Sequence, residues 1–169
     1  MEIRPIKISD AERFVHLIKK VESESPFMLY EAGERMIELK QQEKRIETMQ
    51  KEGNCTIFVA EVNTELIGYL IALGGNAKRN KHSVYVVIGI LTQYQGTGIG
   101  TKLFAYLEDW AADHHVHRLE LTVITRNEAG VRLYKKMGFE IEGTKRHSLF
   151  IDGKFEDEYH MSKLLLYKE

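Results

Sequence analysis

An almost wholly apolar segment, residues 83–91, runs directly into a glycine-rich turn, and this junction constrains the fold more than any other part of the chain. A continuous apolar run of this length is typical of a strand that is covered on both faces at the centre of a sheet. The turn, Gln95-Gly96-Thr97-Gly98-Ile99-Gly100, then opens a predicted helix that starts at Ile99. A helix N-terminus directs unpaired N–H groups toward one point, and glycines let that backbone approach an anion closely. The junction therefore predicts a phosphate-binding loop.

Three known kinds of phosphate loop can be compared with this turn. A P-loop needs Ser or Thr directly after Gly-Lys, but Lys102 follows Thr101 and precedes Leu103. The dinucleotide fingerprint Gly-x-Gly-x-x-Gly needs a glycine where Thr101 stands, which disfavours a nicotinamide-binding protein. The pattern Gln-x-x-Gly-x-Gly fits residues 95–100 without a gap. A plain tight connection between strand and helix is the structural alternative.

Apolar periodicity along the chain predicts an α/β (mixed α+β) fold, with helices on the faces of a mixed sheet, in one domain that spans residues 1–169. A capping box at Ser9 and Glu12 is expected to open the first helix, and Asp152-Gly153 is expected to form a hairpin turn. The predicted strands are 3–8, 56–62, 66–73, 83–91, 119–123, 148–151 and 159–166, and the predicted helices lie between Ser9 and Pro26, at 34–51, from 99 onward, and at 127–137.

Charge and composition exclude several classes of function. The chain has 24 Lys and Arg against 25 Asp and Glu, so it carries no basic field that would attract nucleic acid or an anionic membrane. It lacks the run of about 20 apolar residues that spans a bilayer, and its start does not resemble a signal peptide. A single cysteine, Cys55, forms no internal disulfide. We therefore expect a cytoplasmic protein.

A second motif follows the glycine turn by one helix and one strand. Asn127 precedes Tyr134 by seven residues, and Gly138-Phe139 follows. Each residue has a structural explanation, since Asn caps helices, Gly ends them and Tyr packs in cores. The Tyr134 hydroxyl near a strand end could also donate a proton. The combination of this motif with the glycine turn is far less expected by chance than either motif alone.

Together the two motifs resemble the GNAT superfamily of N-acetyltransferases, and the resemblance covers essentially the whole chain. It implies a mostly antiparallel central sheet that is splayed between its fourth and fifth strands, at a bulge near 88–91, where the pantetheine arm of acetyl-CoA inserts. The end of the chain, 138–161, is similar to members that act on small amines or protein N-termini. The resemblance implies that acetyl-CoA contacts Ile90, Leu91, Thr92, Gln95, Gly96, Thr97, Gly98, Ile99, Gly100, Thr101 and Asn127.

The family's reaction is direct attack of a primary amine on the acetyl thioester, without a metal. By resemblance, Tyr134 is the residue that protonates the departing thiolate. Many relatives have a Glu as base in the fourth strand, but this chain has Tyr85 there. Deprotonation through water, or by Glu31, His147 or Asp157, stays open. The alternative function is a catalytically silent CoA-binding sensor or interaction module.

Two further clusters have simpler explanations. The histidines at 114–117 lie at a predicted helix end, where they complement the helix dipole, and no carboxylate or cysteine lies at ligand spacing. The basic segment 78–82 is interpreted as a solvated loop that could meet the 3′-phosphate of CoA. An edge strand of such a sheet could also pair across a homodimer.

Overall fold

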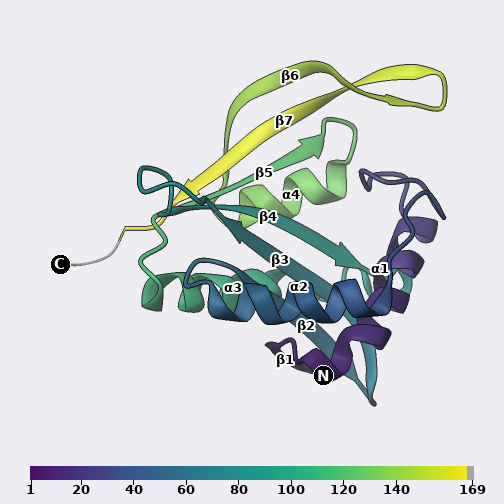
Figure 1. The fold of residues 1–169 in the computed structure, drawn as a ribbon. Coiled ribbons are helices and arrows are strands. Elements are labelled where there is room, and N and C mark those ends of the chain that lie inside the picture. Colours follow the sequence, from purple (N-terminus) through teal and green to yellow (C-terminus); the bar gives the residue numbers. More distant parts are fainter. Residues whose placement is uncertain (167–169) are drawn as a thin grey trace.

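The computed structural model describes residues 1–166, which form a seven-stranded sheet and four α-helices (Figure 1). The strands are β1 (Glu2–Pro5), β2 (Thr56–Val62), β3 (Glu65–Gly74), β4 (Ser83–Ile90), β5 (Arg118–Ile124), β6 (Glu140–Ile151) and β7 (Lys154–Leu164). The helices are α1 (Ala11–Glu24), α2 (Leu39–Lys51), α3 (Ile99–Asp113) and α4 (Glu128–Lys136), with short 3-10 turns η1 (Ile8–Asp10) and η2 (Thr92–Tyr94).

The sheet has the order β1-β2-β3-β4-β5-β7-β6, and within the described residues its one parallel pair is β4 and β5. That pair is short, because its register runs only from Ser83 opposite Arg118 to Tyr85 opposite Glu120. Beyond Tyr85 the two strands diverge, as Figure 1 shows. The predicted fold class, including the splay between the fourth and fifth strands, is confirmed.

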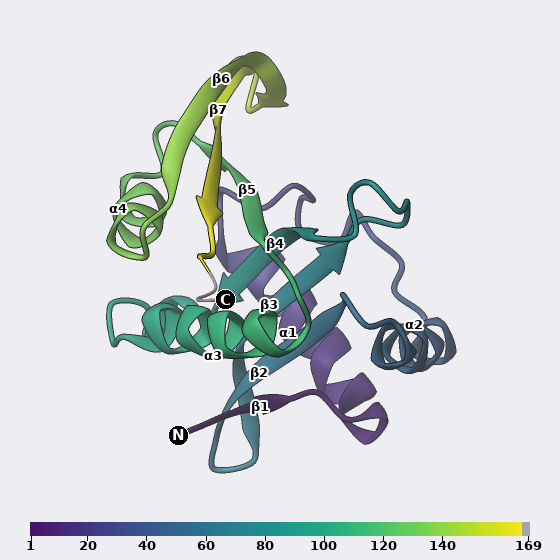
Figure 2. The same ribbon diagram turned by 90° about the vertical axis from the view of Figure 1, so that its left-hand side faces the viewer.

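Helices cover both faces of the sheet. Figure 2 shows α3 and α4 on one side, and α1 and α2 on the other. On the second side, Phe14 of α1 packs edge-on against Tyr69 of β3, with ring centroids 5.5 Å apart. On the first side, Leu103 and Leu107 of α3 are fully buried. Each such side chain contributes about 1.5–3 kcal/mol of hydrophobic stabilisation, so both layers hold the central strands in place.

The first helix starts differently from the predicted capping box. Asp10, not Ser9, is the N-cap residue of α1, without a side-chain cap hydrogen bond, and its carboxylate instead accepts the Lys7 N–H at 2.8 Å, at the start of η1. The same carboxylate pairs with Arg4 and Arg13, so it joins β1 to α1. This tertiary pairing favours Asp10 over the local Ser9–Glu12 motif.

The second helix begins at Leu39 rather than at residue 34, which corrects the predicted range. The chain at Glu38 is extended, and Met36 is 91% exposed. Arg35 forms an ion pair with Glu22 of α1, which draws this segment toward α1 instead of allowing it to continue the helix. Helical propensity is weak compared with such a contact.

The C-terminal hairpin is longer than predicted, because β6 begins at Glu140 and not at Ser148. Its first eight residues are exposed, so they lack the apolar alternation by which a strand is detected. Asp152 and Gly153 do form the turn, with φ of 50° and 77°. Figures 1 and 2 show this hairpin extending away from the helices.

No helix within residues 1–166 is long and apolar enough to cross a membrane.

Candidate active site

The turn between β4 and α3 presents a row of backbone N–H groups to solvent. Gly96 and Gly98 have φ of 74° and 87°, a left-handed backbone that L side chains rarely adopt, and Gly98 is the N-cap of α3. Within residues 1–166 no N–H group from Gly96 to Thr101 has a hydrogen-bond partner, and the bond from Lys102 N–H to Gly98 O, at 3.1 Å, is the first of the helix. Free donors at the positive end of a helix dipole form a site for an anion such as a pyrophosphate.

Side chains of the same turn are exposed but also brace it through hydrogen bonds. Gln95 Nε2 donates to Ile90 O at 3.1 Å, and Thr97 Oγ1 donates to Tyr94 O at 2.6 Å. Their observed contacts are therefore with the loop itself. The loop is held in shape, and the backbone remains free for a ligand.

Lys136 of α4 is a residue near this loop that the sequence did not reveal. Its Nζ lies 3.4 Å from Thr101 Oγ1, in the first turn of α3. The ammonium group therefore adds a positive charge beside the free N–H groups. No pattern in the sequence indicates this contact, because Thr101 lies on another helix, 35 residues away.

The backbone of β4 is open on the side that faces β5. Leu91 N–H donates to Ile67 O at 3.0 Å, toward β3. Because successive residues of a strand direct their backbone groups to opposite sides, Ile88 and Ile90 direct theirs toward β5. The pairing with β5 has already ended at Tyr85. Ile90 O already accepts Gln95 Nε2, so on this unpaired edge it is the Ile90 N–H and the backbone of Ile88 to which an extended ligand arm would add hydrogen bonds.

Two other residues predicted for the same contact have occupied N–H groups. Leu91 N–H is bound by Ile67 O, and Thr92 N–H donates to Glu24 Oε2 at 2.8 Å. The register of β4 with β3 also continues without interruption from Val84 to Ile90, so the expected bulge near 88–91 is absent from that pairing. The gap arises from divergence of β4 and β5 alone.

Tyr134 of α4 lies in an aromatic cluster below the loop. Its ring meets Phe104 and Phe139 with centroids 5.8 and 6.2 Å away, and only 9% of the residue is exposed. Burial, with a smaller contribution from Tyr85, raises the pKa of Tyr134 above its usual value. Its hydroxyl makes no hydrogen bond within the described part of the chain. The phenol is therefore protonated and available as a donor.

Tyr85, which stands where a base was expected, bridges the two diverging strands. Its hydroxyl lies 2.7 Å from Thr122 Oγ1 of β5, just where the strand pairing ends. Asn127 caps the helix that carries Tyr134, since its Oδ1 accepts the Gly130 N–H at 3.0 Å. These observed roles are structural, and a contact of Asn127 with acetyl-CoA stays a prediction.

Residues 19–139, most of the chain, match the model of the Acetyltransferase (GNAT) family. The chain belongs to this family. It is therefore an N-acetyltransferase, and the resemblance inferred from the two motifs is confirmed. The loop, the open edge of β4 and Tyr134 all lie within the matched residues.

Similar proteins include a spermidine acetyltransferase and solved structures with the same fold. The chain is 26% identical to the spermidine N(1)-acetyltransferase of Escherichia coli K12 over 163 residues, which cover 95% of this chain and 84% of that protein. A GNAT-family acetyltransferase from Streptococcus pneumoniae has 30% identity and a TM-score of 0.94, covering 97% of this chain and 98% of the other. YncA from Salmonella typhimurium, whose structure contains acetyl-CoA, shares the fold with a TM-score of 0.88 at 19% identity, covering 100% and 96% of the two chains.

The candidate bases of this acetyltransferase lie on two different segments. His147 and Asp157 meet on the β6–β7 hairpin, where His147 N–H donates to Asp157 Oδ1 at 2.8 Å. Asp157 O also accepts the Thr125 N–H at 3.0 Å, so the pair lies next to the end of β5. Glu31 lies on the exposed connection between α1 and α2, where its backbone N–H donates to Glu34 Oε2 at 2.9 Å. The structure brings His147 and Asp157 together.

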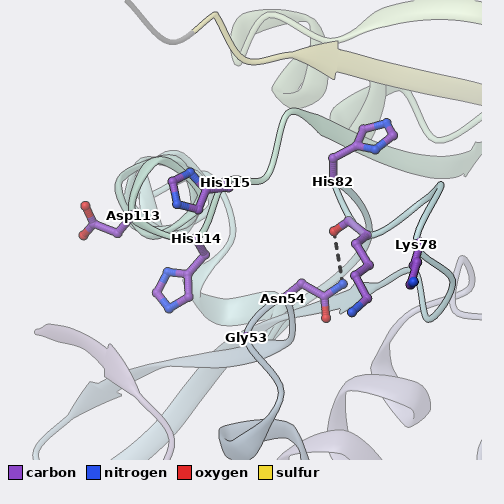
Figure 3. A pocket seen from close by; sticks show the side chains of 8 residues that line it. Gly53, Asn54, Lys78, His82, Asp113, His114 and His115 are labelled. Atoms are coloured by element: carbon purple, nitrogen blue, oxygen red, sulfur yellow. Dashed lines mark hydrogen bonds between the residues drawn. The ribbon is translucent and has the colours of Figure 1, made fainter. Parts of the chain in front are cut away.

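A cavity of about 510 Å³ lies far from the glycine turn. It lies between the segment before β4 and the end of α3, and Figure 3 shows Lys78, His82 and His114 around it. The glycine turn follows the opposite end of β4, and eight residues of strand span about 25 Å. The expected contact of segment 78–82 with the 3′-phosphate of CoA is thus not supported by the geometry.

The histidine cluster at 114–117 lies at the C-terminal end of α3. His114 is the C-cap of α3 and stacks on Trp110, with ring centroids 4.5 Å apart. Across the described ranges, no group of three or more His, Cys, Asp or Glu side chains could hold a metal ion.

Cys55 is 8% exposed, and burial raises the pKa of its thiol to about 11. A thiol in that state is a poor nucleophile, so Cys55 is a core residue.

Proposed function

We propose that this acetyltransferase transfers the acetyl group of acetyl-CoA to a primary amine, of a small molecule or a protein N-terminus, by direct attack in a ternary complex. The observation that carries the proposal is the row of free N–H groups from Gly96 to Thr101 beside the open edge of β4 at Ile90. One element suits a pyrophosphate and the other suits an extended amide arm. Acetyl-CoA contains both groups.

The donor set fits acetyl-CoA on chemical grounds. The N–H groups from Gly96 to Thr101 are free donors, and Lys136 adds a cation at 3.4 Å from Thr101. Backbone N–H groups and an ammonium bind phosphate oxygens directly. The left-handed glycines Gly96 and Gly98 have nothing within 4 Å of a Cβ position, so the approach to the turn is open.

In the proposed reaction, Tyr134 supplies the proton that the departing sulfur needs. The amine nitrogen forms a bond to the acetyl carbon and loses a proton to water or to one of the candidate bases. The carbon–sulfur bond breaks, the sulfur takes the phenolic proton, and Tyr134 regains a proton from solvent. Tyr134 suits this role because its hydroxyl has no protein partner and its pKa is raised, which keeps it protonated. The unpaired backbone of β4 donates to the thioester oxygen.

A thiol-release assay tests this function. The protein is incubated with acetyl-CoA and a panel of primary amines, amino acids and peptides, and free CoA is measured together with the acetylated product. We expect acceptor-dependent release of CoA. Tight CoA binding by calorimetry, with no acetylated product from any acceptor, would instead support the CoA-binding sensor.

A further inference from the structure

A charged cluster lies between α1, α2 and the connection that joins them, residues 25–38. Glu22 of α1 is 5% exposed and forms an ion pair with Arg35 of this connection. Arg45 of α2 is exposed and has no ion pair within residues 1–166, and partial burial of its guanidinium, followed by the nearby charge of Arg35, lowers its pKa. The cluster therefore contains two guanidinium groups and one buried carboxylate.

The same cluster contains hydrogen-bond donors without acceptors. Arg35 Nε and Gln42 Nε2 are both buried and have no hydrogen-bond partner in the described part of the chain. Gln42 is only 4% exposed. It precedes Arg45 by three residues on α2, so the two side chains are neighbours on one face of the helix. These two donors, close to the unpaired guanidinium of Arg45, lack an oxygen acceptor.

This cluster lies next to the proposed reaction centre. Tyr69 is buried between them, and burial raises its pKa, while nearby Arg35 and Arg45 act in the opposite direction. The Tyr69 hydroxyl lies 2.8 Å from the position of a Cβ on Gly89, in β4. Gly89 stands between Ile88 and Ile90, whose backbone groups face the gap. The cluster is thus separated from the open edge of β4 by one tyrosine ring.

The connection 25–38 leaves part of the Arg35 side chain exposed and runs to the end of β5. Arg35 retains 29% of its side-chain exposure, and Tyr30, over which it stacks at 4.2 Å, retains 37%. Phe27 lies under the guanidinium of Arg126, 5.2 Å away, just after the end of β5. Because α3 and α4 cover the other face, an acceptor reaches β4 from the side on which this cluster lies (Figure 2).

We propose that Arg35, Arg45 and Gln42 bind a carboxylate of the acceptor, so that the enzyme acetylates amines with a free carboxylate, as in amino acids, in preference to polyamines. This assignment rests on the proposed acetyl transfer to a primary amine. Guanidinium groups bind carboxylates with charge-assisted, often bidentate hydrogen bonds. A polyamine would instead meet two like charges, one of them without a paired carboxylate.

Matched acceptors test the proposal without any mutation. A set of L-amino acids is compared with the corresponding amino-acid amides and with spermidine, using acetyl-CoA and the thiol-release assay. We expect kcat/KM to be roughly 10- to 100-fold higher for each acid than for its amide, mainly through KM. Equal values for acids and amides, or faster transfer to spermidine, would overturn the assignment.

Two variants and one control test whether these residues cause the preference for acids. Arg35→Gln should remove most of the preference for acids, whereas Arg79→Gln, on the exposed segment before β4, should leave it unchanged. Gln42→Met removes a buried donor that has no partner, so it should not lower the melting temperature, yet it should reduce the preference several-fold. A purely structural role predicts an altered melting temperature with an unchanged preference.

A binding experiment keeps this proposal separate from the proposed function. Calorimetry measures the binding of an N-acetylated amino acid and of its amide in the presence of CoA. If no acceptor is acetylated but the acid still binds more tightly, and Arg35→Gln abolishes that difference, the catalytic proposal fails and the carboxylate site stands. If acetyl transfer occurs without preference for acids, the carboxylate site fails and the function stands.

Discussion

Leu133 Cδ2 lies 2.7 Å from the position that a Cβ atom would take on Gly100. Gly100 therefore lets α4 pack closely against the start of α3, and through this contact it holds the helix of Tyr134 against the glycine turn. Gly96 and Gly98 differ, because nothing lies within 4 Å of their Cβ positions and both have positive φ. Within one motif, Gly100 thus allows the two helices to pack closely, whereas Gly96 and Gly98 keep the backbone accessible to a ligand.

Gly98→Ala should weaken CoA binding roughly 10-fold or more, because a methyl group then projects from the N-cap that the pyrophosphate must approach. Isothermal calorimetry with CoA measures the effect. Gly153→Ala is the matched control, since Gly153 also has positive φ and nothing within 4 Å. Both variants carry similar backbone strain, so both should lose similar thermal stability. A Gly98→Ala protein with unchanged CoA affinity would refute the pyrophosphate assignment.

Tyr134→Phe should lower kcat by roughly 10²-fold with little change in the KM for acetyl-CoA or in melting temperature. Phenylalanine retains the packing against Phe104 and removes only the proton donor. Tyr106→Phe, at an exposed position of α3, provides the control and should retain full activity. Joint loss of stability and CoA binding in Tyr134→Phe would show that the tyrosine is purely structural.

The pH dependence of the same step follows from the direction of the shift. Because burial raises the pKa of Tyr134, the phenol stays protonated up to at least about pH 10, the usual tyrosine value. Wild-type kcat should therefore show no decline that depends on Tyr134 below that pH. A decline near pH 9 that disappears in Tyr134→Phe would contradict a raised pKa.

Prolonged treatment with EDTA should leave the activity intact. The free N–H groups of the glycine turn bind phosphate oxygens directly, so the pyrophosphate needs no bridging cation there. Activity is measured before and after chelation, followed by addition of Mg²⁺ or Zn²⁺. Loss of activity that a divalent ion restores would show that a metal takes part.

Asp10→Asn should destabilise the fold by about 3 kcal/mol at neutral pH, because it leaves the partly buried Arg4 without its main partner. Burial by itself would raise the pKa of Asp10, but hydrogen bonds from Arg4, Lys7 and Arg13 outweigh it and lower the pKa to about 2. The folded-state pKa lies below the unfolded value, so this stabilisation is complete above about pH 4 and disappears as the pH falls through about 2.

Melting temperatures of wild type and Asp10→Asn, measured from pH 7 down to pH 2, check this prediction. The difference between the two proteins should shrink in the acidic range. Asp109→Asn, at an exposed position without an ion pair in the described chain, should match the wild type throughout. A difference that stays constant to pH 2 would show that Asp10 acts through packing rather than charge.

Elements with local signals could be predicted from the amino-acid sequence. A left-handed glycine before a helix and a two-residue Asp152-Gly153 turn depend on backbone conformations that few residues adopt, so composition reveals them. Apolar periodicity likewise identified α1, α3 and the central strands, because it records which face of an element is buried. The family, and Tyr134 as a candidate proton donor, were inferred from these local patterns.

Which residues of distant segments meet depends on how the elements pack in the folded protein. The pairing of Glu22 with Arg35 holds residues 34–38 out of the second helix, and Arg45 joins that cluster from another helix. Lys136 reaches Thr101 only because α4 packs on α3, and the gap opens only because β4 and β5 diverge after Tyr85. Long charged side chains carry no periodic signal of their partners, since the energy of an ion pair depends on distances that the folded topology creates.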